Sequence, residues 1–205
     1  MGLKGTSVYS STKKIVYVAL ICNLLVAFTK TGAAAWTGSS AMLSEAVHSF
    51  VDTGNEVLLL YGMRQSRKQA DPEHPLGYGR ELYFWSFIVA LLVFALGAGV
   101  SIYEGVLHML YGEAINDPLV NYLVLALAFV FDGVSWLKAL QQFKVAKWNL
   151  GYYEAFRRSK DPSSFMVLVE DTAALIGILL AAFGTFAATY FNLPILDGFA
   201  SILIG

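Results

Sequence analysis

Long apolar stretches follow one another along the chain from residue 15 to the end. Five of them reach the roughly 20 residues that a helix needs to cross the hydrocarbon core of a bilayer: 15–35, 41–63, 82–110, 119–140 and 164–191. A sixth, 193–205, is still apolar at the last residue and is too short to span. The pattern predicts an all-α polytopic bundle of six transmembrane helices, the sixth incomplete, forming one transmembrane domain over 1–205.

Composition agrees with a membrane protein. The chain is 57% hydrophobic and 14% charged, with a mean hydropathy of +0.58, whereas a soluble domain of this size needs a more polar surface. The net charge of −1 gives no basic surface, so we expect no nucleic-acid partner. One cysteine excludes a disulfide framework and a cysteine-rich metal cluster.

Basic residues alternate between the two sides of the predicted spans. They lie before the first span, between the second and third, and between the fourth and fifth: Lys4, Lys13, Lys14, Arg64, Arg67, Lys68, Arg80, Lys144, Lys147, Arg157, Arg158 and Lys160. The connections 36–40, 111–118 and 190–194 carry none. Because basic loops stay in the cytoplasm, we expect a multi-pass protein with a cytoplasmic N-terminus. We place it in a bacterial inner or plasma membrane rather than an organelle membrane.

A polar stripe runs along the second predicted span: Glu45, His48, Asp52, Asn55 and Glu56. Their spacing puts them on one arc of a helix, and ionisable groups inside a bilayer indicate function because burying them is costly. His48 and Asp52, one turn apart, fit a shared cation or a buried hydrogen bond equally well. Contacts between helices explain Glu45 and Glu56 as well as a metal does.

A second acidic centre lies in the fifth span, at Glu170 and Asp171. Asp171 lies at a depth broadly similar to that of Asp52. Carboxylates without a basic partner repel one another, and a bound dication or protons would relieve the repulsion. This centre tips the balance toward a metal site at which the pair His48 and Asp52 and the pair Glu170 and Asp171 converge.

Other polar residues within the spans have two interpretations each. Lys30 either reaches back to the outer interface or forms an ion pair with an acid. Asp132 serves a proton step, or forms a hydrogen bond with Ser135 or a neighbouring helix. Glu104 and His108 have the spacing of metal ligands, but His108 lies near the outer interface, which favours a structural or hydrated role.

Several motifs resemble those of the cation diffusion facilitators, also called zinc transporters. They are Asn23, Lys30-x-Gly32, Gly38-Ser39-x-Ala41, Glu45-x-x-His48-Ser49-x-x-Asp52 and Asp71-x-x-His74-Pro75-x-Gly77-x-Gly79-x-Glu81. The segment 168–174 is most similar to the branch that contains the mitochondrial zinc exporter.

The resemblance implies a six-helix domain, followed in most members by a cytoplasmic domain that we expect to be absent from this chain. Members are homodimers that export zinc or a related divalent cation from the cytoplasm, commonly in exchange for protons. Zinc is then the transported substrate and not a cofactor, and the chain is not an enzyme.

In the family, a second-span pair corresponds to His48 and Asp52, and a fifth-span pair corresponds to Val167 and Asp171. Valine cannot coordinate a metal. Glu170 is the obvious substitute, although it points about 100° away from Asp171 on an ideal helix.

Water or Glu45 could instead complete the ligand shell. Oxygen-rich sites favour harder cations, so manganese, iron and cobalt stay alternatives to zinc. A metal site in the loop, at Asp71 and His74, lacks its second histidine because that position is Tyr78, and the loop is predicted to be mainly structural.

Two other classes of function compete with transport. An intramembrane metallohydrolase would need a motif such as His-Glu-x-x-His, and none occurs in the sequence. A membrane scaffold would use the acids only for helix packing, and it would bind no metal specifically.

Overall fold

A computed structural model describes residues 5–146 and 162–205, and within these ranges every regular element is a helix. The elements are α1 (Gly5–Thr37), α2 (Ser40–Ser66), α3 (Glu81–Leu92), η1 (Val93–Ala98), α4 (Gly99–Tyr111), α5 (Pro118–Ala146), α7 (Pro162–Phe191) and α8 (Ile195–Ile204). The predicted all-α bundle is confirmed. The basic residues Lys147, Arg157, Arg158 and Lys160 lie outside the described ranges.

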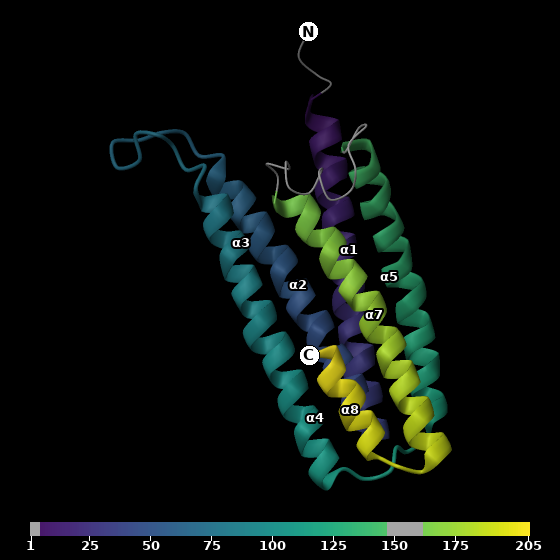
Figure 1. The fold of residues 1–205 in the computed structure, drawn as a ribbon. Helices are drawn as coiled ribbons and strands as arrows, with labels where there is room; N and C mark the ends of the chain where they lie inside the picture. The colour runs from purple at the N-terminus through teal and green to yellow at the C-terminus, as the bar shows by residue number, and fades with distance from the viewer. Residues whose placement is uncertain (1–4, 147–161) are drawn as a thin grey trace.

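The helices form a bundle with two distinct ends (Figure 1). The loop end carries the start of α1 and the connection 67–80. The turn end carries the connections 38–39, 112–117 and 192–194. α2 packs against α1, α3, α4, α7 and α8, and α5 packs against α1 and α7. The short α8 turns back from α7 and lies beside α4.

A tight turn sets α1 and α2 antiparallel. Gly38 has a φ of +72°, a left-handed conformation that glycine adopts without the cost of a Cβ. Ser39 then caps α2, because its side-chain oxygen accepts a hydrogen bond from the Met42 backbone N–H at 3.1 Å. The cap satisfies one of the free N–H groups at the start of the helix.

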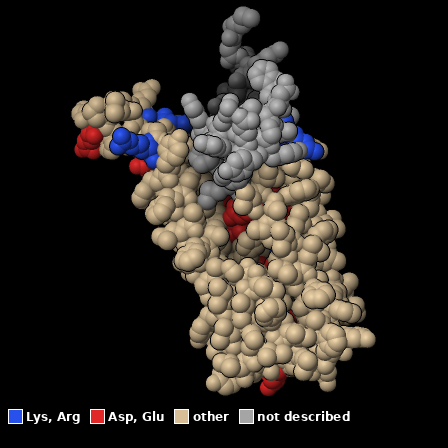
Figure 2. Space-filling view, viewed as in Figure 1, with Lys and Arg blue, Asp and Glu red and all other residues tan. Residues whose placement is uncertain are grey.

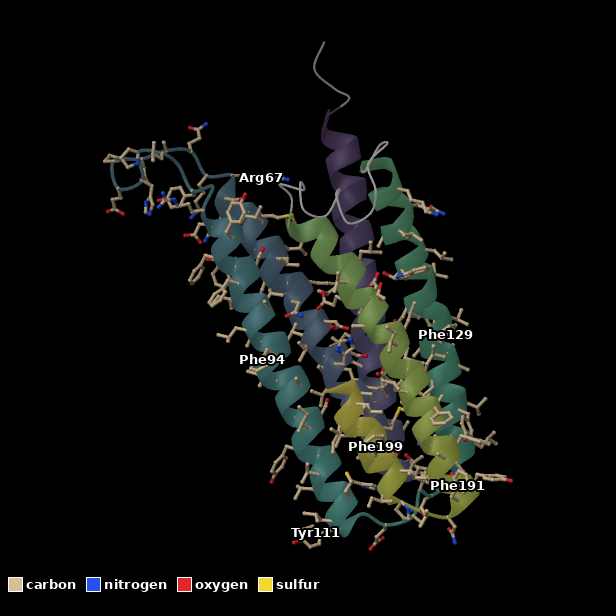
Figure 3. The ribbon with its side chains drawn as sticks, in the orientation of Figure 1. Arg67, Phe94, Tyr111, Phe129, Phe191 and Phe199 are labelled. Carbon is tan, nitrogen blue, oxygen red and sulfur yellow. The ribbon has the colours of Figure 1, made fainter. Side chains whose placement is uncertain are left out.

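The outside of the bundle is apolar. Figure 2 shows charged side chains gathered at the loop end and an almost uncharged flank below them. Aromatic side chains such as Phe94 and Phe129 point outward from the bundle (Figure 3) and are 74% and 41% exposed. Among the described residues, three helices are long and apolar enough to cross a membrane: 81–111, 118–141 and 168–191. α2 is not among them, since its polar stripe lowers its hydropathy.

Small side chains close the bundle toward the turn end. The core there consists of Ala33, Ala34, Ala41, Met42, Leu125, Ala128, Ile178, Ala181 and Ala200. α4 and α8 approach more closely still at Gly105 and Gly198. A Cβ on either glycine would lie 2.7 Å from the carbonyl oxygen of the other, so the two backbones are in contact.

Two predicted spans take forms that the apolar pattern does not reveal. The third, expected as one helix over 82–110, contains the six-residue π-helical turn η1, which widens the helix locally. The sixth is α8, whose ten residues extend about 15 Å, roughly half of the hydrocarbon thickness.

Candidate functional site

The polar stripe of α2 faces the interior of the bundle. Glu45 and Asn55 are fully buried, at 0% and 1% exposure, and each meets a neighbouring helix. Asn55 Nδ2 donates to Glu170 Oε1 on α7 at 2.5 Å. Asn23 Nδ2 on α1 donates to Glu56 Oε1 at 3.0 Å. The polar stripe of α2 therefore contacts both α1 and α7.

A cavity of about 50 Å³ lies among α1, α2, α5 and α7. Its lining includes five carboxylates, from Asp52, Glu56, Asp132, Glu170 and Asp171. The other lining residues are Asn23, Val26, Ser49, Leu59, Ser135 and Ala174. Figure 2 shows acidic side chains in a hollow of the flank, just below the loop end. We call this space the acidic cavity.

The structure brings most of the predicted site residues to this cavity. Asp52, Glu170 and Asp171 all line it. His48 lies one turn from Asp52, and its Nε2 is 3.4 Å from Asp52 Oδ2. Neither His48 Nε2 nor Asp52 Oδ1 has a hydrogen-bond partner among the described residues, so both atoms retain a free lone pair or proton.

The predicted ligands do not converge on one point in this structure. Within residues 5–146 and 162–205, no three His, Cys, Asp or Glu side chains are grouped closely enough to hold a metal ion. Like charges favour separation of carboxylates, so a dication would have to draw them together. Asp171 is held toward α5 by Ser135, whose Oγ donates to Asp171 Oδ2 at 3.1 Å.

A buried ion pair lies on the turn-end side of the cavity. Lys30 on α1 is 0% exposed, and its Nζ lies 3.0 Å from Glu45 Oε2, 2.9 Å from Ser49 Oγ and 3.9 Å from Asp132 Oδ2. Of the two interpretations of Lys30, the ion pair is therefore confirmed. This placement takes one oxygen of Glu45 away from any metal at Asp52.

Charge is unbalanced around the cavity. Five carboxylates line it and Glu45 lies beside it, while the described ion pairs bring to these acids one lysine, Lys30, and one histidine, His48. Taking so many carboxylates out of water is costly unless cations or protons compensate for them. The cavity is therefore suited to a divalent cation.

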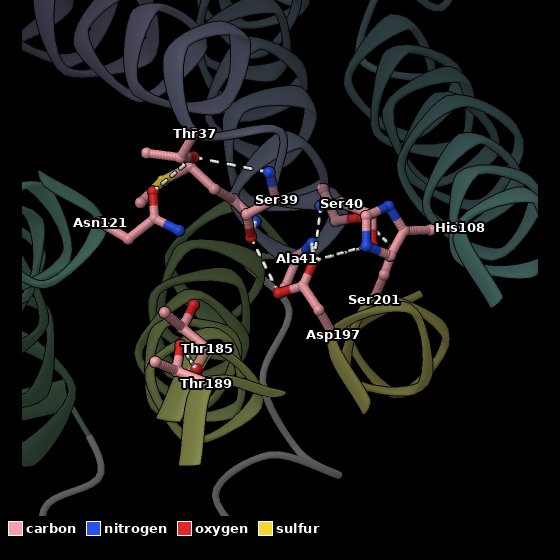
Figure 4. A network of polar contacts seen from close by, with 12 residues as sticks. Thr37, Ser39, Ser40, Ala41, His108, Asn121, Thr185, Thr189, Asp197 and Ser201 are labelled. Atoms are coloured by element: carbon pink, nitrogen blue, oxygen red, sulfur yellow. Dashed lines mark hydrogen bonds and ion pairs between the residues drawn. The ribbon is translucent and has the colours of Figure 1, made fainter. Parts of the chain in front are cut away.

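A different buried carboxylate, missed by sequence reasoning, lies at the turn end (Figure 4). Asp197 on α8 is 0% exposed. It accepts hydrogen bonds from Ser39 Oγ at 2.8 Å, Ser40 N at 2.6 Å, Ser40 Oγ at 3.1 Å and Ala41 N at 3.2 Å. A carboxylate at the N-terminus of α2 is also stabilised by the helix dipole. His108 Nε2 lies 3.8 Å from Asp197 Oδ2.

The loop residues Asp71 and His74 lie away from the cavity. Tyr78 Oη donates to Asp71 Oδ2 at 2.5 Å, the His74 backbone N–H donates to Oδ1 at 2.7 Å, and His74 Nδ1 is 3.4 Å from Oδ1. The hydrogen bond from Tyr78, followed by that from His74, lowers the pKa of Asp71, and the same bond raises the pKa of Tyr78 to about 12. Both side-chain oxygens of Asp71 thus serve the turn.

Residues 16–205 match the model of the cation efflux transmembrane domain. The chain belongs to the cation efflux family.

Three relatives illustrate what the chain is similar to, and two of them are named after different metals. The proton-coupled zinc antiporter SLC30A9, mitochondrial, of Xenopus laevis is 36% identical over 194 residues, which is 94% of this chain and 35% of the relative. Metal tolerance protein C4 of Arabidopsis thaliana is 36% identical over 197 residues, 95% of this chain and 43% of the relative. The manganese efflux system protein MneP of Bacillus subtilis is 26% identical over 174 residues, which is 84% of this chain and 56% of the relative. The chain thus spans about a third of the length of the zinc antiporter.

The motif residues that resemble the family lie at two places in the structure. Asp52 lines the acidic cavity and His48 lies beside Asp52, and Gly38-Ser39-x-Ala41 forms the turn that binds Asp197. The side chain of Val167 lies outside the described part of the structure. The signal that could have indicated Asp197 was the pair of adjacent serines at 39 and 40, which offer donors at the start of a helix.

Proposed function

We propose that this chain carries a divalent cation, zinc first, across the membrane through the acidic cavity. The observation that supports the proposal most strongly is that Asp52 on α2 and Asp171 on α7 line one small, negatively charged space inside an apolar bundle. His48, Asp52 and Asp171 would bind the ion, with Glu170 as the fourth ligand. Glu45 is a weaker candidate, because Lys30 already binds it. The names of the relatives favour transport over catalysis or a scaffold.

Proton exchange follows from the chemistry of these ligands. A metal binds neutral imidazole and ionised carboxylates, so protons and the metal compete for the same atoms. Protons that enter from the opposite side would displace the cation, which gives antiport without any further device. His48 suits this competition, since histidine changes charge near neutral pH.

The two ends of the bundle suggest a direction of transport. The small-residue core and the Asp197 network close the turn end, while the hollow lies below the loop end. With the N-terminus on the cytoplasmic side, the cavity would take up its cation from that side, as export requires.

We also propose a homodimer, on the basis of the resemblance alone. The multi-pass architecture agrees with the family, but the word mitochondrial in the names of relatives gives no support to a bacterial membrane.

Proton-coupled uptake can be measured directly. We expect the protein in liposomes with an internal zinc-sensitive dye to take up zinc, faster with an opposing proton gradient. Asp52→Ala should reduce the rate at least about 100-fold, as expected when a metal ligand is lost. Glu104→Gln, an acid of α4 outside the cavity lining, is the matched control and should stay within about twofold of wild type. Equal uptake by wild type and Asp52→Ala would refute the proposal. A rate of uptake that does not depend on the proton gradient would refute exchange with protons.

Manganese is the second candidate, and the oxygen-rich lining favours it. Five carboxylates line the cavity and a single imidazole lies near them, and harder cations prefer oxygen ligands. One relative is named as a manganese efflux protein. Competition of manganese, iron and cobalt against zinc uptake in the same liposomes would rank the cations. A zinc site is supported if a tenfold excess of manganese leaves the rate of zinc uptake above half of its value without manganese.

A further inference from the structure

Lys30 is a buried cation with more acidic neighbours than it can neutralise. It is 0% exposed and lies near two carboxylates on different helices, Glu45 on α2 and Asp132 on α5. Its contacts with them are unequal. Nζ forms a hydrogen bond of 3.0 Å with Glu45 Oε2 and another of 2.9 Å with Ser49 Oγ. The 3.9 Å to Asp132 Oδ2 is too long for a hydrogen bond.

Glu45 is the fixed partner of Lys30. Its carboxylate is fully buried and rests against Gly177 on α7, where the absence of a side chain makes room for Oε1. α1, α2 and α7 therefore hold the Lys30–Glu45 pair between them. Separating the pair would leave two uncompensated charges in the bilayer, which is strongly destabilising.

Asp132 is the loosely held partner. Its side chain is 24% exposed and lines the acidic cavity together with Asp52 and Asp171. Among the described residues, its carboxylate forms no hydrogen bond and has only the long contact with Lys30. Lys30 therefore keeps Asp132 near the cavity without occupying its oxygens.

We propose that Asp132 exchanges between Lys30 and the transported cation. Asp132 is then a further ligand, contributed by α5, and Lys30 is the cation that holds it, in competition with the metal, while the site is empty. This inference rests on the proposed function. The attraction between charges scales with their product, so a dication outcompetes a lysine for the same carboxylate. Lys30 keeps Glu45 and Ser49 when Asp132 leaves, so no buried charge is stranded.

The exchange would complete the site from a third helix. α2 contributes His48 and Asp52, α7 contributes Asp171 with Glu170, and α5 would add an oxygen at Asp132. Val167, which the family resemblance pairs with Asp171, cannot coordinate a metal, so a ligand from α5 would add to a set that is one side chain short. Binding would draw α5 toward α2 and α7, which couples the cation to helix movement.

The first test measures zinc affinity by calorimetry on the purified protein in detergent. If Asp132 contacts the cation, Asp132→Asn raises the zinc Kd about tenfold or more. Glu104→Gln is the control and leaves the Kd within about twofold. Unfolding temperatures of all variants report whether each is folded. A folded Asp132→Asn with the wild-type Kd overturns the inference and leaves the proposed function standing, whereas wild type that binds no zinc overturns both.

The second test removes Lys30 without stranding its partner. The double variant Lys30→Gln with Glu45→Gln keeps the net charge and frees Asp132 from its competitor. We expect its zinc Kd to fall about threefold to tenfold below that of wild type. The gain should vanish when Asp132→Asn is added, because nothing is left to free. An equal effect with and without Asp132 would show that Lys30 is only structural and would overturn the inference.

Discussion

Carboxylates inside this bundle lie at two different depths and have opposite surroundings. Asp197, near the turn end, is fully buried and accepts four hydrogen bonds from residues 39–41 at the start of α2. Asp52 and Asp171 lie at the acidic cavity, with other acids as neighbours and few donors. Asp171 has Ser135, and one oxygen of Asp52 has no partner among the described residues.

The difference separates an acid whose hydrogen bonds join α8 to the start of α2 from acids that we propose bind a cation. A carboxylate whose lone pairs are filled by backbone and hydroxyl donors is stabilised in its charged form and has little to offer a metal. A carboxylate among like charges gains from any cation that enters. Burial also differs, at 0% exposure for Asp197 against 24% for the Asp52 side chain, but the supply of hydrogen-bond donors is what distinguishes the two roles.

The largest expected effect is at Asp197. Asp197→Ala leaves the donors of Ser39, Ser40 and Ala41 without an acceptor, and we expect the free energy of unfolding to fall by about 3 kcal/mol. Thermal unfolding in detergent measures the loss. The folded protein should retain its zinc affinity, because Asp197 does not line the acidic cavity. A loss of zinc binding without a loss of stability would mean that Asp197 serves zinc binding instead of the fold.

A smaller loss is expected where α4 and α8 meet. In Gly198→Ala the new Cβ would lie 2.7 Å from the Gly105 carbonyl oxygen, so the helices must move apart, and we expect a loss of about 2 kcal/mol. Gly133→Ala on α5 is the matched control, since no atom lies within 4 Å of its added Cβ. The same unfolding experiment compares them. Equal stability of the two variants would mean that the turn end is not closed by this contact.

The smallest effect should have the opposite sign. Asp171→Asn removes one of several repelling charges while its side-chain oxygen can still accept from Ser135. We expect the metal-free protein to gain up to about 1 kcal/mol. Zinc should stabilise wild type, because it binds the folded state, and should stabilise this variant much less. Unfolding with and without zinc gives both results. A destabilised variant that zinc still protects would mean that Asp171 serves the fold instead.

Much of the fold is predictable from the sequence because helix length and lipid contact are local requirements. The apolar stretches had to be long enough to cross the bilayer, and the stripe at 45, 48, 52, 55 and 56 had to face away from lipid. The motifs around His48 and Asp52 also sufficed to indicate the family. The π-helical turn η1 was not predicted, because residues in a π-helical turn can be as apolar as those of the α-helix around it.

The acids of the second, fourth and fifth spans were identified from the sequence, whereas Asp197 was missed, and the different surroundings of these acids could not be predicted. An acid in an apolar helix has the same sequence signature at 132, 171 and 197. Only the packing of α8 against the start of α2 gives Asp197 its donors, and only the approach of α1 and α5 puts Lys30 between Glu45 and Asp132. The sequence alone thus determined which residues are costly to bury, because that cost belongs to the side chain. The tertiary structure decided what offsets the cost, because hydrogen bonds and ion pairs depend on neighbours that lie far apart along the chain.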